Sequence, residues 1–269
     1  MTIESKTIER IHHTMRSAAV DACEILRDHL GRIDIEKKGA VDLVTQADRM
    51  SEEAVIGHIR QAFPDHAILA EESGASSNKL NEGFCWVIDP LDGTTNYAHA
   101  VPVFSVSIGV LLDGQPFSGL IVEVMRDDWF FAHRGNGATL NEKPIHVSET
   151  SELDDALVLT GFPHDRRKNV RHFMDILEVF LNESRGVLRL GSAAIDLAYV
   201  ACGRAEAFYE EHLSPWDVAA GSLIVEEAGG RISGLQDDIP AIFGKSILAT
   251  NGVIHPAMQD VFRRSWKPW

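Results

Sequence analysis

The order of apolar segments along the chain limits the possible folds more than any other feature of the sequence. Two helical patterns come first, at residues 4–30 and 49–63, and short apolar stretches typical of strands follow them. In the second half, strand-like stretches alternate with helical patterns, which indicates a layered α/β arrangement. We expect one compact unit over residues 1–269, with an α+β region at 1–150 and an α/β region at 151–269.

Turn residues and side-chain alternation refine this expectation. Asp113-Gly114 and Asp127-Asp128 predict hairpin turns between neighbouring strands. Residues 104–112 alternate like a strand that buries only one face. The other expected strands are 67–70, 85–88, 119–124, 129–132, 157–160, 186–190, 205–209 and 246–250, and the later expected helices are 167–182, 192–202, 216–228 and 254–264.

Composition excludes several classes of protein. The chain of 269 residues has 40 acidic and 25 basic side chains, a net charge of −15, which disfavours binding to the phosphates of nucleic acid. Cys23, Cys85 and Cys202 are too widely spaced for a CxxC metal site and indicate a reducing compartment. The longest apolar run, 106–112, is too short to span a membrane. A cytoplasmic protein with no membrane partner is expected.

The segment from Trp86 to Asn96 is the strongest functional signal. An apolar strand ends at Asp89, a second carboxylate follows at Asp92, and a Gly-Thr-Thr turn begins at Gly93. Two neighbouring carboxylates favour a hard cation such as Mg²⁺, Mn²⁺ or Ca²⁺, and the turn can open a helix whose N–H groups bind an anion. The alternative is an Asp-Gly turn in which an aspartate caps the helix.

Three other acidic segments have a structural and a functional interpretation each. Glu71-Glu72 follows an expected strand and is either a solvated charge pair or part of a cation site. Asp48 stands three residues after Thr45, which is the spacing of a helix capping box. Asp217 has the same relation to Ser214, and capping also brings its carboxylate to a helix N-terminus, so the two roles are compatible.

Taken together, these motifs resemble the inositol monophosphatase family of Mg²⁺-dependent, Li⁺-sensitive phosphomonoesterases. The resemblance covers nearly the whole chain and implies an αβαβα sandwich, usually a homodimer. The motifs that carry it are Asp42-Leu43-Val44-Thr45 through Asp48, Ala70-Glu71-Glu72-Ser73-Gly74, Asp89-Pro90-Leu91-Asp92-Gly93-Thr94-Thr95-Asn96-Tyr97, and Trp216-Asp217 through Ala228-Gly229-Gly230.

The resemblance also implies roles for individual residues in binding the metal ions. Glu71, Asp89 and the carbonyl of Leu91 would hold a first Mg²⁺, and Asp89, Asp92 and Asp217 a second. A third, weaker Mg²⁺ would lie near Glu71. Mn²⁺ is an expected substitute for Mg²⁺, and Li⁺ and Ca²⁺ are expected inhibitors.

Catalytic and substrate-binding roles follow from the same resemblance. Thr94, hydrogen-bonded to Asp48, and Glu71 would orient and deprotonate the attacking water, with no covalent intermediate. The N–H groups of Gly93 and Thr94 would bind the phosphate. The residues implied to bind the rest of the substrate are Asp92, Ser192, Ala193 and Glu210.

The resemblance favours a myo-inositol monophosphate as the substrate. Fructose-1,6-bisphosphatase, 3′-phosphoadenosine-5′-phosphate phosphatase, histidinol phosphatase and NADP phosphatase are the alternatives, and a non-enzymatic regulatory role in transcription is a third class. A basic cluster, made of His164, Arg166, Arg167, Lys168, Arg171 and His172, stands against the general acidity. It is either a solvated helix face or a binding site for an anion, such as a second substrate phosphate or an acidic surface of a partner subunit.

Overall fold

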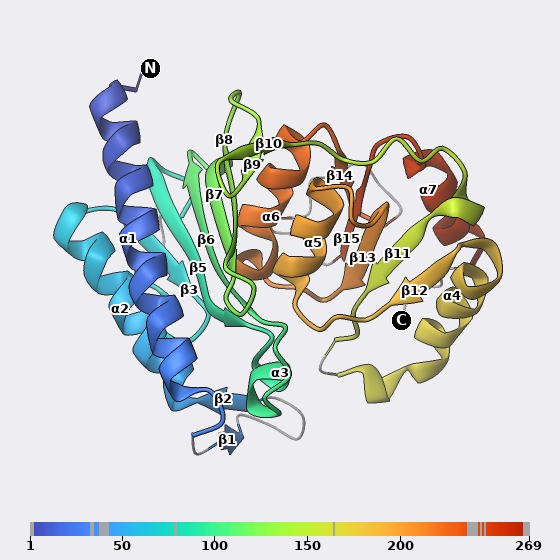
Figure 1. Cartoon of the computed structure of the whole chain (residues 1–269), viewed down its shortest axis with the longest axis horizontal. Coiled ribbons are helices and arrows are strands. Elements are labelled where there is room, and N and C mark those ends of the chain that lie inside the picture. Colours follow the sequence, from blue (N-terminus) through green and yellow to red (C-terminus); the bar gives the residue numbers. More distant parts are fainter. Residues whose placement is uncertain are drawn as a thin grey trace.

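The chain folds into alternating layers of helices and sheets. Figure 1 shows them edge-on as a helix pair, a sheet, a second helix pair, a second sheet and a third helix pair. This is the αβαβα arrangement that the resemblance implied. The structure is a computed structural model and describes residues 3–32, 35–37, 43–77, 80–163, 165–235, 242, 244 and 246–265, without the side chains of 35–37 and 43–45.

The first sheet is built mainly from hairpins. In the described residues its strand order is β10-β9-β8-β7-β6-β5-β3-β4, and its neighbours are antiparallel except β3 and β5. The turn between β6 and β7 is Asp113-Gly114, with φ angles of 49° and 76°, as a two-residue hairpin requires. The strands are β3 (Ala67–Ala70), β4 (Gly74–Ala75), β5 (Phe84–Asp92), β6 (Ser105–Leu112), β7 (Gln115–Glu123), β8 (Asp128–His133), β9 (Ala138–Leu140) and β10 (Lys143–Ile145).

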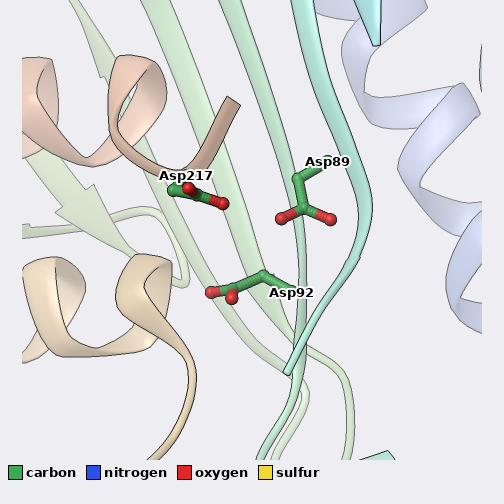
Figure 2. A group of neighbouring side chains, drawn as sticks. All are labelled: Asp89, Asp92 and Asp217. Atoms are coloured by element: carbon green, nitrogen blue, oxygen red, sulfur yellow. The ribbon is translucent and has the colours of Figure 1, made fainter. Parts of the chain in front are cut away.

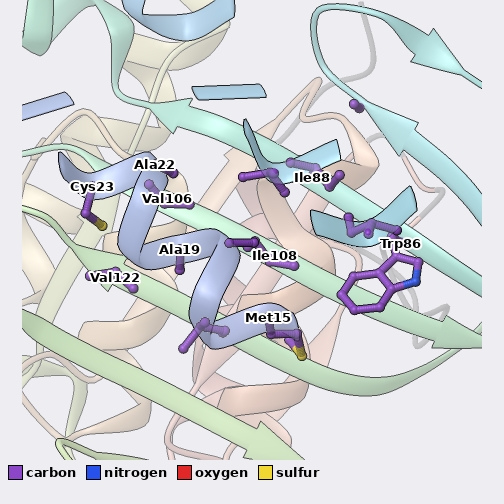
Figure 3. Packing of buried hydrophobic residues seen from close by; sticks show 14 of the residues in the cluster. Met15, Ala19, Ala22, Cys23, Trp86, Ile88, Val106, Ile108 and Val122 are labelled. Carbon is purple, nitrogen blue, oxygen red and sulfur yellow. The ribbon is translucent and has the colours of Figure 1, made fainter. Parts of the chain in front are cut away.

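Two long helices cover the outer face of this sheet. They are α1 (Ser5–His29) and α2 (Gln46–Ala62), and between them β1 (Ile35–Lys37) pairs with β2 (Leu43–Thr45). The apolar residues of α1 recur at helical spacing, so one stripe of the helix is buried. Figure 3 shows Met15 and Ala19 of this stripe packed over Ile108 and Val122 of the sheet.

The inner face of the first sheet is covered as well, by α5 (Ala193–Ala201) and α6 (Pro215–Glu227). The expectation that residues 104–112 bury only one face is therefore wrong, because seven of the eight residues of β6 are buried. The approach of α6 depends on glycine: a Cβ on Gly119 would lie 2.7 Å from the carbonyl oxygen of Ala220. Close packing of α6 holds its N-terminus at the end of β5, where the acidic residues lie.

The second sheet lies on the other side of α5 and α6. Its strand order in the described residues is β12-β11-β13-β15-β14, with parallel pairs on either side of β11 and antiparallel pairs at β15. Helices α4 and α7 cover its outer face and bury apolar side chains against it. The elements are β11 (Leu157–Thr160), α4 (Val170–Glu183), β12 (Gly186–Leu188), β13 (Ala207–Glu211), β14 (Arg231–Ser233), β15 (Ser246–Thr250) and α7 (His255–Ser265), with short 3-10 turns at Leu153–Asp155 and Arg166–Lys168.

Most expected elements are present, with shifted ends. The helix expected at 167–182 begins at Val170 because a 3-10 turn precedes it, and the strand expected at 205–209 begins at Ala207. Six short strands were not expected, since two or three residues show no periodicity: β1, β2, β4, β9, β10 and β14. The division into regions 1–150 and 151–269 stays a prediction. None of the helices in the described ranges is long and apolar enough to cross a bilayer.

Candidate active site

A bulge at the end of β5 brings Asp89 and Asp92 to the same side of the strand. Asp89 pairs with Ser107 of β6 and Asp92 pairs with Ser105, so β5 advances by three residues where β6 advances by two. In a regular strand, side chains three positions apart point to opposite faces, and the extra residue reverses that relation. Pro90, which has no N–H to donate, fits this interruption.

Asp217 joins this pair from the start of α6. Ser214, Pro215 and Asp217 form the expected capping box, in which the Ser214 N–H donates to Asp217 Oδ2 at 2.6 Å. Oxygen atoms of Asp89, Asp92 and Asp217 lie within 4.8 Å of one another, and Figure 2 shows the three carboxylates turned toward a common space. Capping and convergence thus occur together, as expected. We call these three residues the carboxylate cluster.

Hydrogen bonds fix the orientation of Asp92. Its Oδ2 accepts from Ser192 Oγ at 2.6 Å and from the Ala194 N–H at 2.7 Å, both at the start of α5. Ser105 Oγ lies 3.5 Å from the same oxygen. Because these bonds come from two different elements, they fix the orientation of the carboxylate.

Ionising the three buried carboxyls of the carboxylate cluster together is electrostatically unfavourable. Burial, and then the charges of Glu71, Asp92 and Asp217, raise the pKa of Asp89 well above its usual range. Burial is also the main cause of the raised pKa values of Asp92 and Asp217. Three buried carboxyls resist ionisation together unless a cation neutralises them. A donor set of carboxylate oxygens fits a hard divalent cation.

Glu71 contacts Asp89 of the carboxylate cluster, and Asp48 contacts Thr94, which follows the cluster residue Asp92. Glu71 follows β3, lines the same cavity, and hydrogen-bonds the Asp89 side chain. Its turn is anchored by the buried Glu52, which accepts from the N–H groups of Glu72 and Ser73, both at 2.9 Å. Asp48 is fully buried on α2 and accepts from Thr94 Oγ1 at 3.3 Å, as the resemblance implied.

The short helix α3 (Thr94–Ala98) begins directly after Asp92. Gly93 precedes it with a φ of 98°, in the left-handed region that favours glycine, and the carbonyl oxygens of Val103 and Gly191 lie 3.2 Å from where its Cβ would be. Thr94 Oγ1 also donates to the Leu91 carbonyl at 3.1 Å. The expected Gly-Thr helix start is therefore confirmed. Asp42, the Thr45 side chain and His164 lie outside the described residues.

A cavity of about 680 Å³ opens beside these residues. It is lined by every predicted site residue except Asp48, which stands behind Thr94: Glu71, Asp89, Leu91, Asp92, Gly93, Thr94, Ser192, Ala193, Glu210 and Asp217. The lining also includes Arg166, Arg189, Asp196 and Glu210, which we call the far wall.

Three residues of the far wall were not predicted as site residues. Arg189 and Asp196 were missed altogether, and Arg166 was predicted only as part of the basic cluster. The available signal for Asp196 was a lone carboxylate in the otherwise apolar segment 193–201.

The basic cluster does not form one solvated face. Arg166 lines the cavity, whereas Arg167 and Arg171 are exposed. His172 is buried and its Nε2 contacts Glu211 of β13, so it belongs to the packing between α4 and the second sheet. The interpretation of the whole cluster as a solvated helix face is therefore wrong for His172, and only Arg166 among the described members lines the cavity.

Comparisons with known proteins agree with this geometry. The profile of the Inositol monophosphatase family matches residues 8–267. The "Inositol-1-monophosphatase" of Synechocystis sp. is 48% identical over 227 residues, 84% of this chain and 79% of that protein. The "Nus factor SuhB" of Pseudomonas aeruginosa is 41% identical over 223 residues, 80% and 82% of the two chains. The solved structure of inositol monophosphatase from Anabaena (Nostoc) sp. superposes with a TM-score of 0.88 at 42% identity, covering 96% of this chain and 97% of that one.

Proposed function

Because the chain belongs to the inositol monophosphatase family, and is thereby a phosphomonoesterase, we propose that it releases inorganic phosphate from a small polyol or sugar monophosphate with the help of Mg²⁺. The observation that carries this proposal is the carboxylate cluster, whose oxygens converge within 4.8 Å at the edge of the cavity. The name of the Synechocystis relative makes myo-inositol monophosphate the first candidate substrate.

The residues around the carboxylate cluster fit the metal sites that the family resemblance implies. Asp89, Asp92 and Asp217 would hold one Mg²⁺, and Glu71, Asp89 and the Leu91 carbonyl another. Burial is the main cause of their raised pKa values, and a divalent cation bound between them would offset its cost. Bound Mg²⁺ would lower the pKa of a water molecule and stabilise charge on the phosphoryl oxygens.

The protein's own groups would position the reactants. The Thr94 hydroxyl, hydrogen-bonded to Asp48, and the Glu71 carboxylate would orient the attacking water and take up its proton. The N–H groups of Gly93 and Thr94, at the edge of the cavity, would bind phosphate oxygens. Asp92, Ser192, Ala193 and Glu210 would contact the leaving alcohol. No cysteine is among the described residues that line the cavity, and the serines that contact the cluster, Ser105 and Ser192, donate their hydroxyls to Asp92. We therefore propose direct attack by water.

A panel of small phosphate monoesters tests this proposal. With Mg²⁺ we expect phosphate release from myo-inositol 1-phosphate, a lower rate with Mn²⁺, and inhibition by Li⁺ and Ca²⁺. Fructose 1,6-bisphosphate, 3′-phosphoadenosine 5′-phosphate, histidinol phosphate and NADP represent the alternative substrates. Absence of turnover on every ester, in a protein that binds Mg²⁺, would overturn the proposal.

That outcome would favour a second candidate, a regulatory protein-binding role, for which the name of the P. aeruginosa relative is the supporting observation. Light scattering tests the further proposal, made from the resemblance, that the chain forms a homodimer.

A further inference from the structure

Asp196 is a buried carboxyl that the proposed mechanism does not use. It lies on α5, is 1% exposed, and is one of the residues that line the cavity. Its Oδ1 makes no hydrogen bond to any described group. A buried polar atom without a partner is costly in a folded protein, and its presence calls for an explanation such as a ligand.

Capping of α5 does not explain this side chain. Ser192 is the N-cap residue, and its Oγ accepts from the Ile195 N–H. The Ala194 N–H donates to Asp92, and the Asp196 N–H donates to the Ser192 carbonyl. The N–H groups at positions 194–196 are thus satisfied without the Asp196 carboxyl. The remainder of α5 is alanine, isoleucine, leucine, valine and tyrosine.

Glu210 of β13 stands beside Asp196 in the far wall. A Cβ on Gly161 would lie 1.9 Å from Glu210 Oε2, so the Glu210 side chain lies directly over the Gly161 backbone, where only glycine fits. The charge of Glu210 acts on Asp196, and Arg189 acts on both carboxyls with the opposite sign. Two carboxyls from different elements therefore face the same part of the cavity.

The surroundings favour the neutral form of both carboxyls. Burial and the Asp92 charge raise the pKa of Glu210 to about 8, against the opposing effect of Arg189. Burial, Glu210 and Asp92 raise the pKa of Asp196 well above its usual range. A neutral carboxyl offers one O–H donor and one carbonyl acceptor, which is the complement of an alcohol hydroxyl.

We propose that Asp196 is a second hydroxyl-binding residue of the cavity, which acts beside Glu210 on a polyhydroxylated leaving group. The inference rests on the proposed phosphatase function and names its substrate class: phosphate esters of ring or chain polyols with at least two free hydroxyl groups. Asp196 and Glu210 would each bond one hydroxyl, so the ester is selected by its alcohol and the phosphate is bound at the carboxylate cluster.

Two esters with the same ring and different hydroxyl content provide the test. Myo-inositol 1-phosphate carries free hydroxyls on the ring, and cyclohexyl phosphate carries none. We expect Asp196→Ala to lower the ratio of kcat/KM for the inositol ester to that for the cyclohexyl ester by about 10-fold or more, because hydrogen bonds to substrate hydroxyls discriminate against analogues that lack them. Asp196→Asn keeps the shape and one acceptor, and we expect a smaller fall in the ratio.

Ser222→Ala is the matched control. Ser222 lies on α6 and is also buried, its Oγ also lacks a described hydrogen-bond partner, and it is not among the residues that line the cavity. We expect this variant to leave the ratio unchanged.

The role of Asp196 is overturned if Asp196→Ala and Asp196→Asn both leave the ratio unchanged. This includes an equal fall of kcat/KM for both esters in protein that unfolds at the wild-type temperature. If Asp196→Ala does not fold, the ratio in Asp196→Asn decides. Wild-type protein that binds Mg²⁺ but hydrolyses neither these two esters nor any other ester of the panel would instead overturn the phosphatase proposal itself.

Discussion

The two sides of the cavity differ in whether local sequence motifs mark their residues. Two members of the carboxylate cluster, Asp89 and Asp92, come from one strand end, and the third begins a helix with a recognisable cap. The far wall joins residues from a 3-10 turn, a loop, α5 and β13. The residues of the cluster thus lie in recognisable sequence motifs, whereas the residues of the far wall belong to no such motif. We expect the cluster to provide the chemistry and the far wall to select the alcohol.

The largest expected effect is that of Asp89→Asn. Asp89 is 2% exposed and is a proposed ligand of both metal ions, so its loss should lower kcat/KM for inositol 1-phosphate by about 1,000-fold or more, measured as phosphate release with Mg²⁺. Without metal at neutral pH, the same variant should unfold at a higher temperature than wild type. Burial and the neighbouring carboxylates raise the pKa of Asp89, so folding of the wild type requires this side chain to take up a proton, which asparagine does not need.

Mg²⁺ separates these two effects of Asp89→Asn. A ligand that binds only the folded state raises the unfolding temperature, and this rise should be large in wild type and small in the variant. Asp175→Asn, on the exposed face of α4, is the control and should match wild type in both assays. An Asp89→Asn protein with wild-type turnover would remove the basis for the proposed metal sites.

Thr94→Ala should have the next largest effect. The Thr94 hydroxyl bonds Asp48 and the Leu91 carbonyl, and we propose that it orients the attacking water. Its loss should lower kcat by about 100-fold and change KM little, because general acid–base catalysis contributes on that scale. Thr94→Ser keeps the hydroxyl and should retain most of kcat. Equal damage in the serine and alanine variants would indicate a packing role for the methyl group instead.

The sequence predicted the layers and the carboxylate side of the cavity well, for a physical reason. Amphipathic periodicity and turn chemistry act over a few residues, so α1, the hairpin at Asp113-Gly114 and the capping box at Ser214 follow from local sequence. The burial of both faces of β6 could not be predicted in this way, since it depends on α6, about a hundred residues later.

Neither the bulge in β5 nor the unpartnered oxygen of Asp196 could be predicted from local sequence. A bulge is visible only against the partner strand, here β6, and the position of Asp196 requires α5, β13 and the start of α6 to be in place. Within the active site, the residues that were missed are those that no local motif marks.

Glu210 gives the far wall a pH dependence that can be measured without substrate. Its pKa is about 8 in the folded protein against a model-peptide value of 4.5, so between these limits the folded state holds a proton that the unfolded chain releases. Stability of the metal-free protein should therefore fall as pH rises from about 4.5 to about 8.

Glu210→Gln removes this proton. The unfolding temperature of the variant, relative to wild type, should increase across that pH range by about 2 °C or more, in thermal melts with a chelator present. Glu178→Gln, at an exposed position of α4, should show no such trend. A parallel pH dependence in wild type and Glu210→Gln would mean that Glu210 is ionised in the folded protein, and the hydroxyl-binding chemistry proposed for the far wall would then need a carboxylate.

The smallest expected effect separates Arg166 from its neighbour in sequence. Arg166 lines the cavity and Arg167 is exposed outside it, although the sequence gives no reason to distinguish them. If the far wall also receives a second phosphate, Arg166→Glu should raise KM for an inositol bisphosphate about 5-fold more than for the monophosphate, which is the scale of a solvent-accessible ion pair. Arg167→Glu makes the same change of charge and should leave both KM values near wild type.

The difference in KM between the two variants should shrink in 0.5 M salt. The distance over which salt screens a charge is roughly 10 Å at low ionic strength, and it shortens as the ionic strength rises. Equal effects of the two reversals would show that long-range charge, rather than contact in the cavity, acts on the substrate.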